Sequence, residues 1–177
     1  MIPTLIAIAA ICVAPPVSDT PTYSRQMYCS SPSPNALRAP YGWRDALDAI
    51  RLVETGGLPN EGVGAKGDYR TRNGKRVAMA LGPYQVWEPY FLDAQARDKT
   101  LTTHRSCLTS KAYSERVVRA YMNRYARAAL RRLESGAGTL ADIETVARIH
   151  NGGPRANRPE RLKLTNGYWA KIKKAVR

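Results

Sequence analysis

The stretch from Leu52 to Trp87 constrains the fold most, because it joins a helix end to a hairpin turn. Apolar residues three and four positions apart run from Trp43 to Val53 and predict one face of a helix. Gly56-Gly57 follows, and glycine readily adopts the left-handed conformation in which helices end. Asn73-Gly74 then predicts a two-residue hairpin turn, since a type I′ turn needs positive φ at both central residues.

Two carboxylates fall at this junction. Glu54 lies in the last turn of the predicted helix, where the negative end of the helix dipole favours a protonated acid. A two-residue turn pairs Arg72 with Lys75 and sets Asp68 opposite Met79, near the open base of the hairpin. One proton-donating acid and one ionised carboxylate across a cleft are what hydrolysis of a glycosidic bond requires.

Each acid also has a simpler interpretation. A glutamate near a helix end is usually solvated, and an aspartate in a glycine-rich hairpin is usually a turn former. The functional interpretation of Glu54 and Asp68 gains weight because both lie within one short stretch and because a second motif follows downstream.

The rest of the chain predicts further helices and no strand beyond the hairpin. A capping serine or threonine precedes three of them, and Gly82-Pro83 opens another. The predicted segments are residues 84–97, Lys111 to Leu133 after Ser110, Leu140 to Ile149 after Thr139, and a final helix after Thr165. The fold class is therefore α+β and mostly helical, with about five helices and one small hairpin.

The length of 177 residues indicates one domain, which we place at residues 41–177. Leu5 to Ala14 is too short to span a membrane and has the size of a signal-peptide core, so residues 1–20 are predicted as a signal peptide. Residues 21–40 are rich in proline and serine and predict a linker. The expected location is secreted or periplasmic, where Cys29 and Cys107 have the opportunity to form a disulfide.

The charge points to an anionic partner. The chain has 28 Lys and Arg residues against 14 Asp and Glu, a net charge of +14. Such an excess attracts nucleic acid, a membrane surface or an acidic wall polymer, and charge alone does not choose among them. No His and Cys cluster has metal-ligand spacing and no cofactor motif is present, so we predict neither a metal nor a cofactor. No nucleic-acid motif is present either, and specific nucleic-acid binding is not expected.

A second motif, His150-Asn151-Gly152-Gly153-Pro154, ends the helix predicted from Leu140. The glycines allow the backbone to approach a ligand closely. On local grounds alone, His150 equally fits a helix C-terminal residue that complements the dipole.

The order of several short pieces is similar to the invertebrate-type lysozymes, the destabilase-like branch of the lysozyme superfamily. The pieces cover about residues 42–176. They are Val53-Glu54-Thr55-Gly56, Leu81-Gly82-Pro83-Tyr84-Gln85-Val86, Tyr121-Met122-Asn123-Arg124-Tyr125-Ala126, Ala147 to Pro154, and Tyr168-Trp169. The His-Asn-Gly-Gly-Pro run is the most diagnostic, whereas the first two pieces are shared with lytic transglycosylases.

The resemblance implies a lysozyme-like fold and hydrolysis of β-1,4 bonds between amino sugars of peptidoglycan by a monomeric muramidase. Glu54 matches the family's catalytic acid, and Asp68 is the best match to its second carboxylate. Residues that then line the sugar cleft are Tyr84, Gln85, Tyr121, His150, Asn151 and Gly152. The chain is cysteine-poor for this family, which suggests a bacterial offshoot, and Arg155-Ala156-Asn157 stands where the family commonly has Arg-Gly-Cys. The isopeptidase activity of some members is not carried over, because no serine nucleophile is paired with His150.

Two alternatives stay open. A lytic transglycosylase needs only Glu54 and leaves an anhydro-sugar end. A non-catalytic basic module would bind cell wall or nucleic acid without releasing fragments.

Overall fold

The computed structural model describes residues 40–176 of the chain. The predicted signal peptide at 1–20, nearly all of the predicted linker at 21–40, and Cys29 lie outside these residues. Among residues 40–176 no helix is both long enough and apolar enough to cross a membrane.

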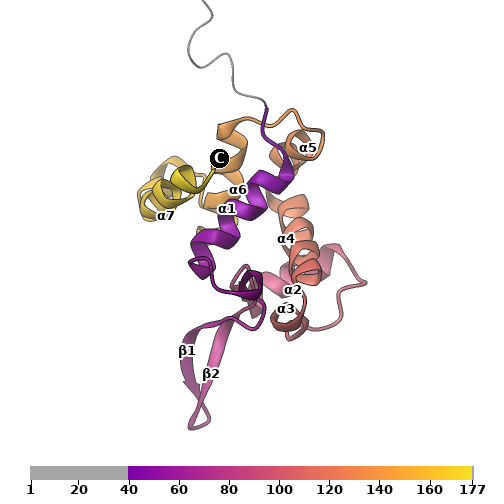
Figure 1. The fold of residues 1–177 in the computed structure, drawn as a ribbon, viewed down its shortest axis with the longest axis vertical. Helices are drawn as coiled ribbons and strands as arrows, with labels where there is room; N and C mark the ends of the chain where they lie inside the picture. The colour runs from indigo at the N-terminus through magenta and orange to yellow at the C-terminus, as the bar shows by residue number, and fades with distance from the viewer. Residues whose placement is uncertain (1–39, 177) are drawn as a thin grey trace, which may run out of the picture. The chain divides into compact units, whose positions relative to one another are not determined.

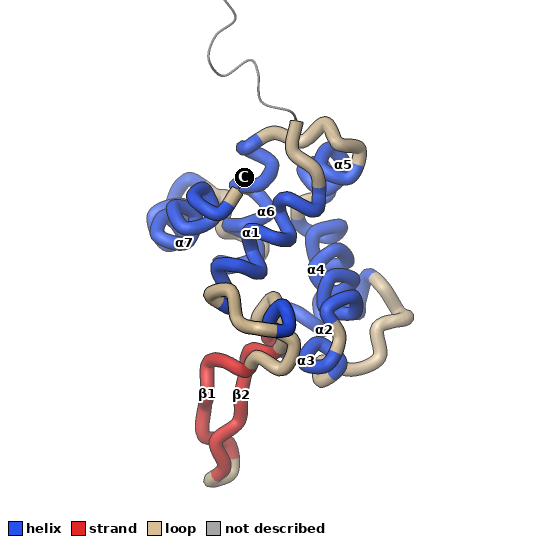
Figure 2. The backbone as a smooth tube through the Cα atoms, viewed as in Figure 1, coloured by secondary structure: helices blue, strands red, loops and turns tan. Residues whose placement is uncertain are grey.

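The described chain is mostly helical with one small antiparallel sheet, which confirms the predicted fold class (Figures 1 and 2). The hairpin of the sheet extends from one end of the helical body, as Figure 2 shows in red. The α-helices are α1 (Trp43–Thr55), α2 (Glu88–Arg97), α3 (Ser106–Thr109), α4 (Lys111–Tyr125), α5 (Arg127–Glu134), α6 (Leu140–Gly152) and α7 (Leu162–Ala175). The strands are β1 (Lys66–Arg72), β2 (Lys75–Leu81) and β3 (Val86–Trp87), and two 3₁₀ turns are η1 (Asn60–Gly62) and η2 (Pro159–Arg161).

Two local predictions for the first half of the chain are confirmed. Helix α1 ends where Gly56 takes φ +58°, so Glu54 lies in its last turn. Asn73 and Gly74 both have positive φ, +50° and +70°, and Arg72 pairs with Lys75 across a two-residue turn. The hairpin register is therefore the one that the Asn-Gly pair dictates.

The segment after the hairpin differs from the prediction. Gly82-Pro83 do not open a helix, because Ala80 and Leu81 pair with Trp87 and Val86 to form a third strand. The four residues between them close a second turn, in which Gln85 has φ +44°. Helix α2 begins only at Glu88, with a proline in its first turn, where a missing N–H costs nothing.

The long helix predicted after Ser110 is two helices. The cap itself is confirmed, since Ser110 Oγ accepts a hydrogen bond from the Tyr113 backbone at 3.1 Å. The helix nevertheless breaks at Ala126, which has φ −135° and ψ 33° and packs into the core at 6% exposure. The short helix α3 was not predicted from its polar sequence.

Of the two threonine caps predicted in the second half, one is confirmed. Thr139 and Asp142 form the reciprocal hydrogen bonds of a capping box at the start of α6. Thr165, in contrast, lies inside α7, which begins at Leu162. Thr165 is 2% exposed and accepts a hydrogen bond from the buried Arg148, so a tertiary contact uses its hydroxyl.

One hydrophobic core holds the helices together. Helix α1 packs against α5, α6 and α7, and α4 packs against α2. Ile50, Val117 and Val146 are fully buried at its centre. Because α1, α6 and α7 meet in this core, the end of α1 that carries Glu54 is brought to the end of α6 and the middle of α7.

Candidate active site

Glu54 contacts residues from the second half of the chain and is partly buried. The hydroxyl of Tyr168, on α7, donates a hydrogen bond to Glu54 Oε1 at 2.8 Å. His150, near the end of α6, places Nε2 at 3.6 Å from the same oxygen. The Glu54 side chain keeps 19% of its surface exposed, so the acid is supported on one oxygen and still accessible.

The hydrogen bonds of His150 assign its tautomer. Nε2 lies 3.1 Å from the backbone carbonyl oxygen of Tyr84, which can only accept, so Nε2 carries a proton. Nδ1 lies 3.2 Å from the hydroxyl of Tyr90, which donates to it when the ring is neutral. The imidazole is thus held at both nitrogens, with its Nε2–H edge between Tyr84 and Glu54.

The two phenols of this network stay protonated. Burial raises the pKa of Tyr90 well above its ordinary value, and the neighbouring Tyr121 and Glu54 add to the effect. Burial also raises the pKa of Tyr168 well above its ordinary value, reinforced by the charge and hydrogen bond of Glu54. Both hydroxyls therefore act as hydrogen-bond donors.

Aromatic packing fixes Tyr90 in place. Its ring stacks on Tyr121, with centroids 3.6 Å apart and planes at 14°. Tyr121 in turn meets Tyr125 edge to face at 4.8 Å. Tyr121 was predicted to line the sugar cleft, but it is only 3% exposed. Its ring packs against the ring of Tyr90 inside the protein.

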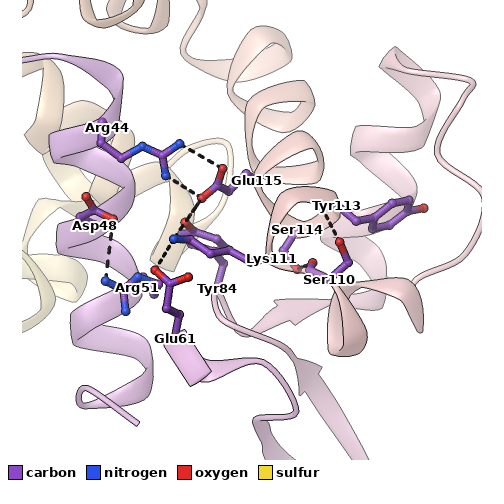
Figure 3. Close-up of polar contacts among 10 residues, drawn as sticks. All are labelled: Arg44, Asp48, Arg51, Glu61, Tyr84, Ser110, Lys111, Tyr113, Ser114 and Glu115. Atoms are coloured by element: carbon purple, nitrogen blue, oxygen red, sulfur yellow. Dashed lines mark hydrogen bonds and ion pairs between the residues drawn. The ribbon is translucent and has the colours of Figure 1, made fainter. Parts of the chain in front are cut away.

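Tyr84 was also predicted as a cleft residue, and its side chain is fully buried. Its hydroxyl donates to Glu115 Oε1 at 3.0 Å, and Arg44 donates to both Glu115 oxygens at 2.7 and 3.2 Å (Figure 3). Burial alone would raise the pKa of Glu115, but the hydrogen bonds from Arg44 and Tyr84 outweigh it and lower this pKa. The buried Tyr84 side chain thus holds the turn in place, and the backbone carbonyl of Tyr84 in this turn binds His150.

A buried arginine that the sequence analysis did not single out joins α6 to α7. Arg148 is 5% exposed and donates to Glu144, to Thr165, to the Leu162 carbonyl and to Asn166. A buried guanidinium with every side of its fork bonded fixes two helices in register. These two helices carry His150 and Tyr168. The available signal was an arginine within the short run Val146 to Ile149, which is otherwise apolar.

Asp68 is exposed on β1 with φ +47°. The pairs Gly67–Ala80 and Tyr69–Ala78 flank it, so the register sets it opposite Met79 as predicted, although the two do not form a ladder pair. Among residues 40–176 the structure gives its carboxylate no hydrogen bond or ion pair. The structure thus leaves this carboxylate unengaged.

The remaining predicted residues lie around the same helix ends. Gln85 is half-buried and donates to the Gly82 carbonyl at 2.9 Å. Asn151 and Gly152 are exposed and directly follow His150. Within residues 40–176 no group of three or more His, Cys, Asp or Glu side chains could hold a metal ion.

Comparison with known proteins shows the family of the chain. Residues 66–175 match the family described as Destabilase. The chain belongs to the destabilase family. Lysozyme 1 of Crassostrea virginica is 35% identical over 129 residues, which is 73% of this chain and 57% of that protein. A lysozyme of Magallana gigas is 36% identical over 96 residues, 54% of this chain and 59% of that protein.

The chain spans just under three fifths of the length of each of these two curated relatives. A solved structure titled as the inhibitor-bound lysozyme from Meretrix lusoria is 26% identical, with a TM-score of 0.47, over 75% of this chain and 89% of that one. The destabilase match includes Asp68, His150 and Tyr168, whereas Glu54 precedes it.

Proposed function

We propose that this destabilase-family protein is a muramidase, a glycoside hydrolase that cleaves β-1,4 bonds between amino sugars of peptidoglycan, with Glu54 as its general acid. The observation that carries the proposal is the contact of Tyr168 with Glu54 Oε1, beside the Nε2–H edge of His150. A buried, hydrogen-bonded support for one accessible carboxyl group suits proton transfer to a leaving oxygen.

The hydrogen bond on Oε1 supports the other oxygen, Oε2, as the proposed proton donor. Tyr168 donates to Oε1, so this oxygen serves as an acceptor and the transferable proton belongs on Oε2. Among the described residues no hydrogen bond occupies Oε2. After the proton has left, Tyr168 and His150 both stabilise the carboxylate, which can then activate water as the general base.

Asp68 is proposed as the second carboxylate, a nucleophile or a stabiliser of positive charge on the sugar. Its exposed carboxyl group has no partner among residues 40–176, so it is available to substrate. In glycosidases, of which a lysozyme is the type case, a retaining pair stands about 5–5.5 Å apart and an inverting pair about 6.5–9.5 Å. We propose the retaining arrangement.

Gln85, Asn151 and Gly152 are proposed to contact the sugars, since Gln85 follows Tyr84, whose carbonyl binds His150, and Asn151 and Gly152 follow His150 itself. Tyr84 and Tyr121 are not retained as sugar contacts, because their side chains are buried. The proposed enzyme works outside the cytoplasm, where its polymer substrate lies, and its net charge of +14 suits an anionic wall.

A lytic transglycosylase remains the second candidate, because Asp68 stands on an exposed hairpin and a transglycosylase needs only Glu54. Its product is distinct, since the glycan end becomes an anhydro sugar. A non-catalytic wall-binding module is the third, and it predicts that wall binding survives loss of Glu54.

The deciding experiment measures the turbidity of a bacterial wall suspension with the native protein and with Glu54→Gln, followed by mass spectrometry of the fragments. We expect clearing by the native protein, reducing ends in its products, and a loss of at least about 100-fold with Glu54→Gln. Anhydro-sugar ends in the fragments would show that the protein is a transglycosylase and not a hydrolase. A Glu54→Gln variant that keeps half of the native rate would remove Glu54 from the mechanism.

A further inference from the structure

A concave surface lies along the β-hairpin. A groove of about 600 Å³ runs between strands β1 and β2 on one side and residues 103–108 on the other, and we call it the hairpin groove. Four cations line it, together with one acid and one aromatic ring. These residues are Lys66, Arg72, Arg76, Arg105, Glu88 and Tyr69.

The two walls of the hairpin groove are joined at the base of the hairpin. His104 Nε2 lies 2.6 Å from the Val86 carbonyl of the third strand, and the Gly64 backbone donates to the Leu108 carbonyl at 2.8 Å. Gly82 packs so closely on the Cys107 carbonyl that a Cβ there would lie 1.8 Å from it. The base of the hairpin groove is therefore held in place by contacts within the fold.

The cations of the hairpin groove are not neutralised within the fold. Among residues 40–176 none of Lys66, Arg72, Arg76 and Arg105 forms an ion pair. In another basic depression of the described chain, two of the four lining cations are paired. There Arg116 pairs with Asp98 at 3.3 Å and Arg119 with Glu134 at 2.5 Å, whereas Arg97 and Lys99 form no ion pair among residues 40–176.

The spacing of the cations favours a polymer over a small anion. Lys66 and Arg72 are the first and last residues of the seven-residue strand β1, which places them about 20 Å apart. One phosphate or carboxylate cannot reach both, whereas a chain with a negative charge at every repeat can. An arginine presents its donors as a planar fork, which binds phosphate oxygens in pairs.

The aromatic rings of the hairpin argue against bases as the ligand. The guanidinium of Arg76 lies over the Tyr69 ring at 4.3 Å, and that of Arg70 lies over Trp87 at 5.1 Å. Each ring thus already carries a cation on one face, where a nucleobase would stack in a single-strand binding site. Among residues 40–176 the Arg76 guanidinium forms no hydrogen bond or ion pair, so its N–H groups are available to an anion.

We propose that the hairpin groove binds a phosphodiester-linked polyol polymer of the bacterial wall, while the glycan strand occupies the site at Glu54. The proposal rests on the proposed function in taking the wall as the partner, but binding needs no catalysis. It predicts a wall-anchoring contact that acts independently of bond cleavage.

The test measures binding by the full chain carrying Glu54→Gln, so that no cleavage intervenes. A fluorescent poly(glycerol phosphate) of defined length is titrated, and its anisotropy gives the affinity. Arg72→Gln/Arg76→Gln removes two charges from the groove. Arg97→Gln/Lys99→Gln removes the same charge from the other basic depression and is the matched control. We expect a loss of about tenfold or more for the groove variant, against less than about threefold for the control.

Equal losses for the two variants, or no loss for either, would overturn the proposal, because net charge alone would then explain binding. Tighter binding of a single-stranded oligonucleotide or a polyglutamate of equal charge would overturn the assignment of the ligand. Far-UV circular dichroism checks the fold, and Lys66→Gln/Arg105→Gln tests the groove again should the first variant misfold. Failure here leaves the proposed function standing, since clearing of walls stripped of phosphodiester polymers tests that separately.

Discussion

The hydroxyl of Tyr168 lies 2.8 Å from Oε1 of Glu54, although 114 positions separate the two residues in the chain. This contact joins the last turn of the first helix to the middle of the last one. It fixes the carboxyl group of the proposed general acid, and it gives a direct way to test the site without removing that acid.

Tyr168→Phe keeps the ring and removes only the donor. The hydrogen bond stabilises the Glu54 carboxylate formed when the proton leaves, so it should be stronger in the transition state than in the ground state. We expect kcat on peptidoglycan fragments to fall about 10- to 100-fold with KM nearly unchanged.

Tyr113→Phe is the matched control, because Tyr113 also uses its hydroxyl, as an acceptor from the backbone of Thr102 and Thr103, away from Glu54. An unchanged kcat in Tyr168→Phe would mean that Tyr168 has no part in catalysis.

Asp68→Asn decides between one and two carboxylates. A hydrolase that uses Asp68 as nucleophile should lose most of its activity, with kcat reduced at least about 100-fold, because the amide cannot attack or stabilise positive charge. NMR of the native product should show that the new reducing end keeps the β configuration. Full activity of Asp68→Asn would instead support the single-carboxylate transglycosylase.

Salt should slow the attack on whole walls. The net charge of +14 draws the protein to an anionic surface, and ions screen that attraction over about 10 Å at 0.1 M. We expect the rate of wall clearing to decline steadily between roughly 0.05 and 1 M sodium chloride, because screening of the surface charge increases over this range of ionic strength. Cleavage of a small neutral chito-oligosaccharide should change much less. Equal salt dependence of the two substrates would show that the basic surface does not guide the encounter.

Asp142 should couple stability to pH. Its hydrogen bond from Arg132 lowers the pKa of this carboxyl group, burial opposes the shift, and Thr139 adds further hydrogen bonds. A lowered pKa means that the stabilisation is complete above the ordinary range of a free aspartate, about 4, and is lost as the pH falls through the folded-state value.

We therefore expect Asp142→Asn to lower the free energy of unfolding by about 1–2 kcal/mol at pH 7. The difference from the native protein should shrink below about pH 4 and vanish in stronger acid. Thermal unfolding across this pH range measures the difference in stability. Asp48→Asn is the control, because the Asp48 side chain is half-exposed. A difference that persists unchanged in acid would assign the effect to packing and not to charge.

The sequence by itself determined those features whose causes lie within a few residues. Gly56 ends α1 because its backbone takes the left-handed conformation, and this sets Glu54 in the last turn. Asn73-Gly74 sets the hairpin register through the geometry of a single turn. Ser110 and Thr139 cap α4 and α6 through side chains that reach only three residues ahead.

Only the tertiary structure decided the features that depend on distant partners. Strand β3 exists because Val86 and Trp87 find a partner in β2, and Thr165 is internal because Arg148 binds it. Tyr84 and Tyr121 were predicted from the sequence as cleft residues, but both are buried in the core. Tyr84 also donates a hydrogen bond to Glu115. The support of Glu54 by Tyr168 and His150 arises in the same way. Burial of apolar surface brings α1, α6 and α7 together. This driving force depends on the area buried and has no direction, so no short sequence motif shows which helices will meet.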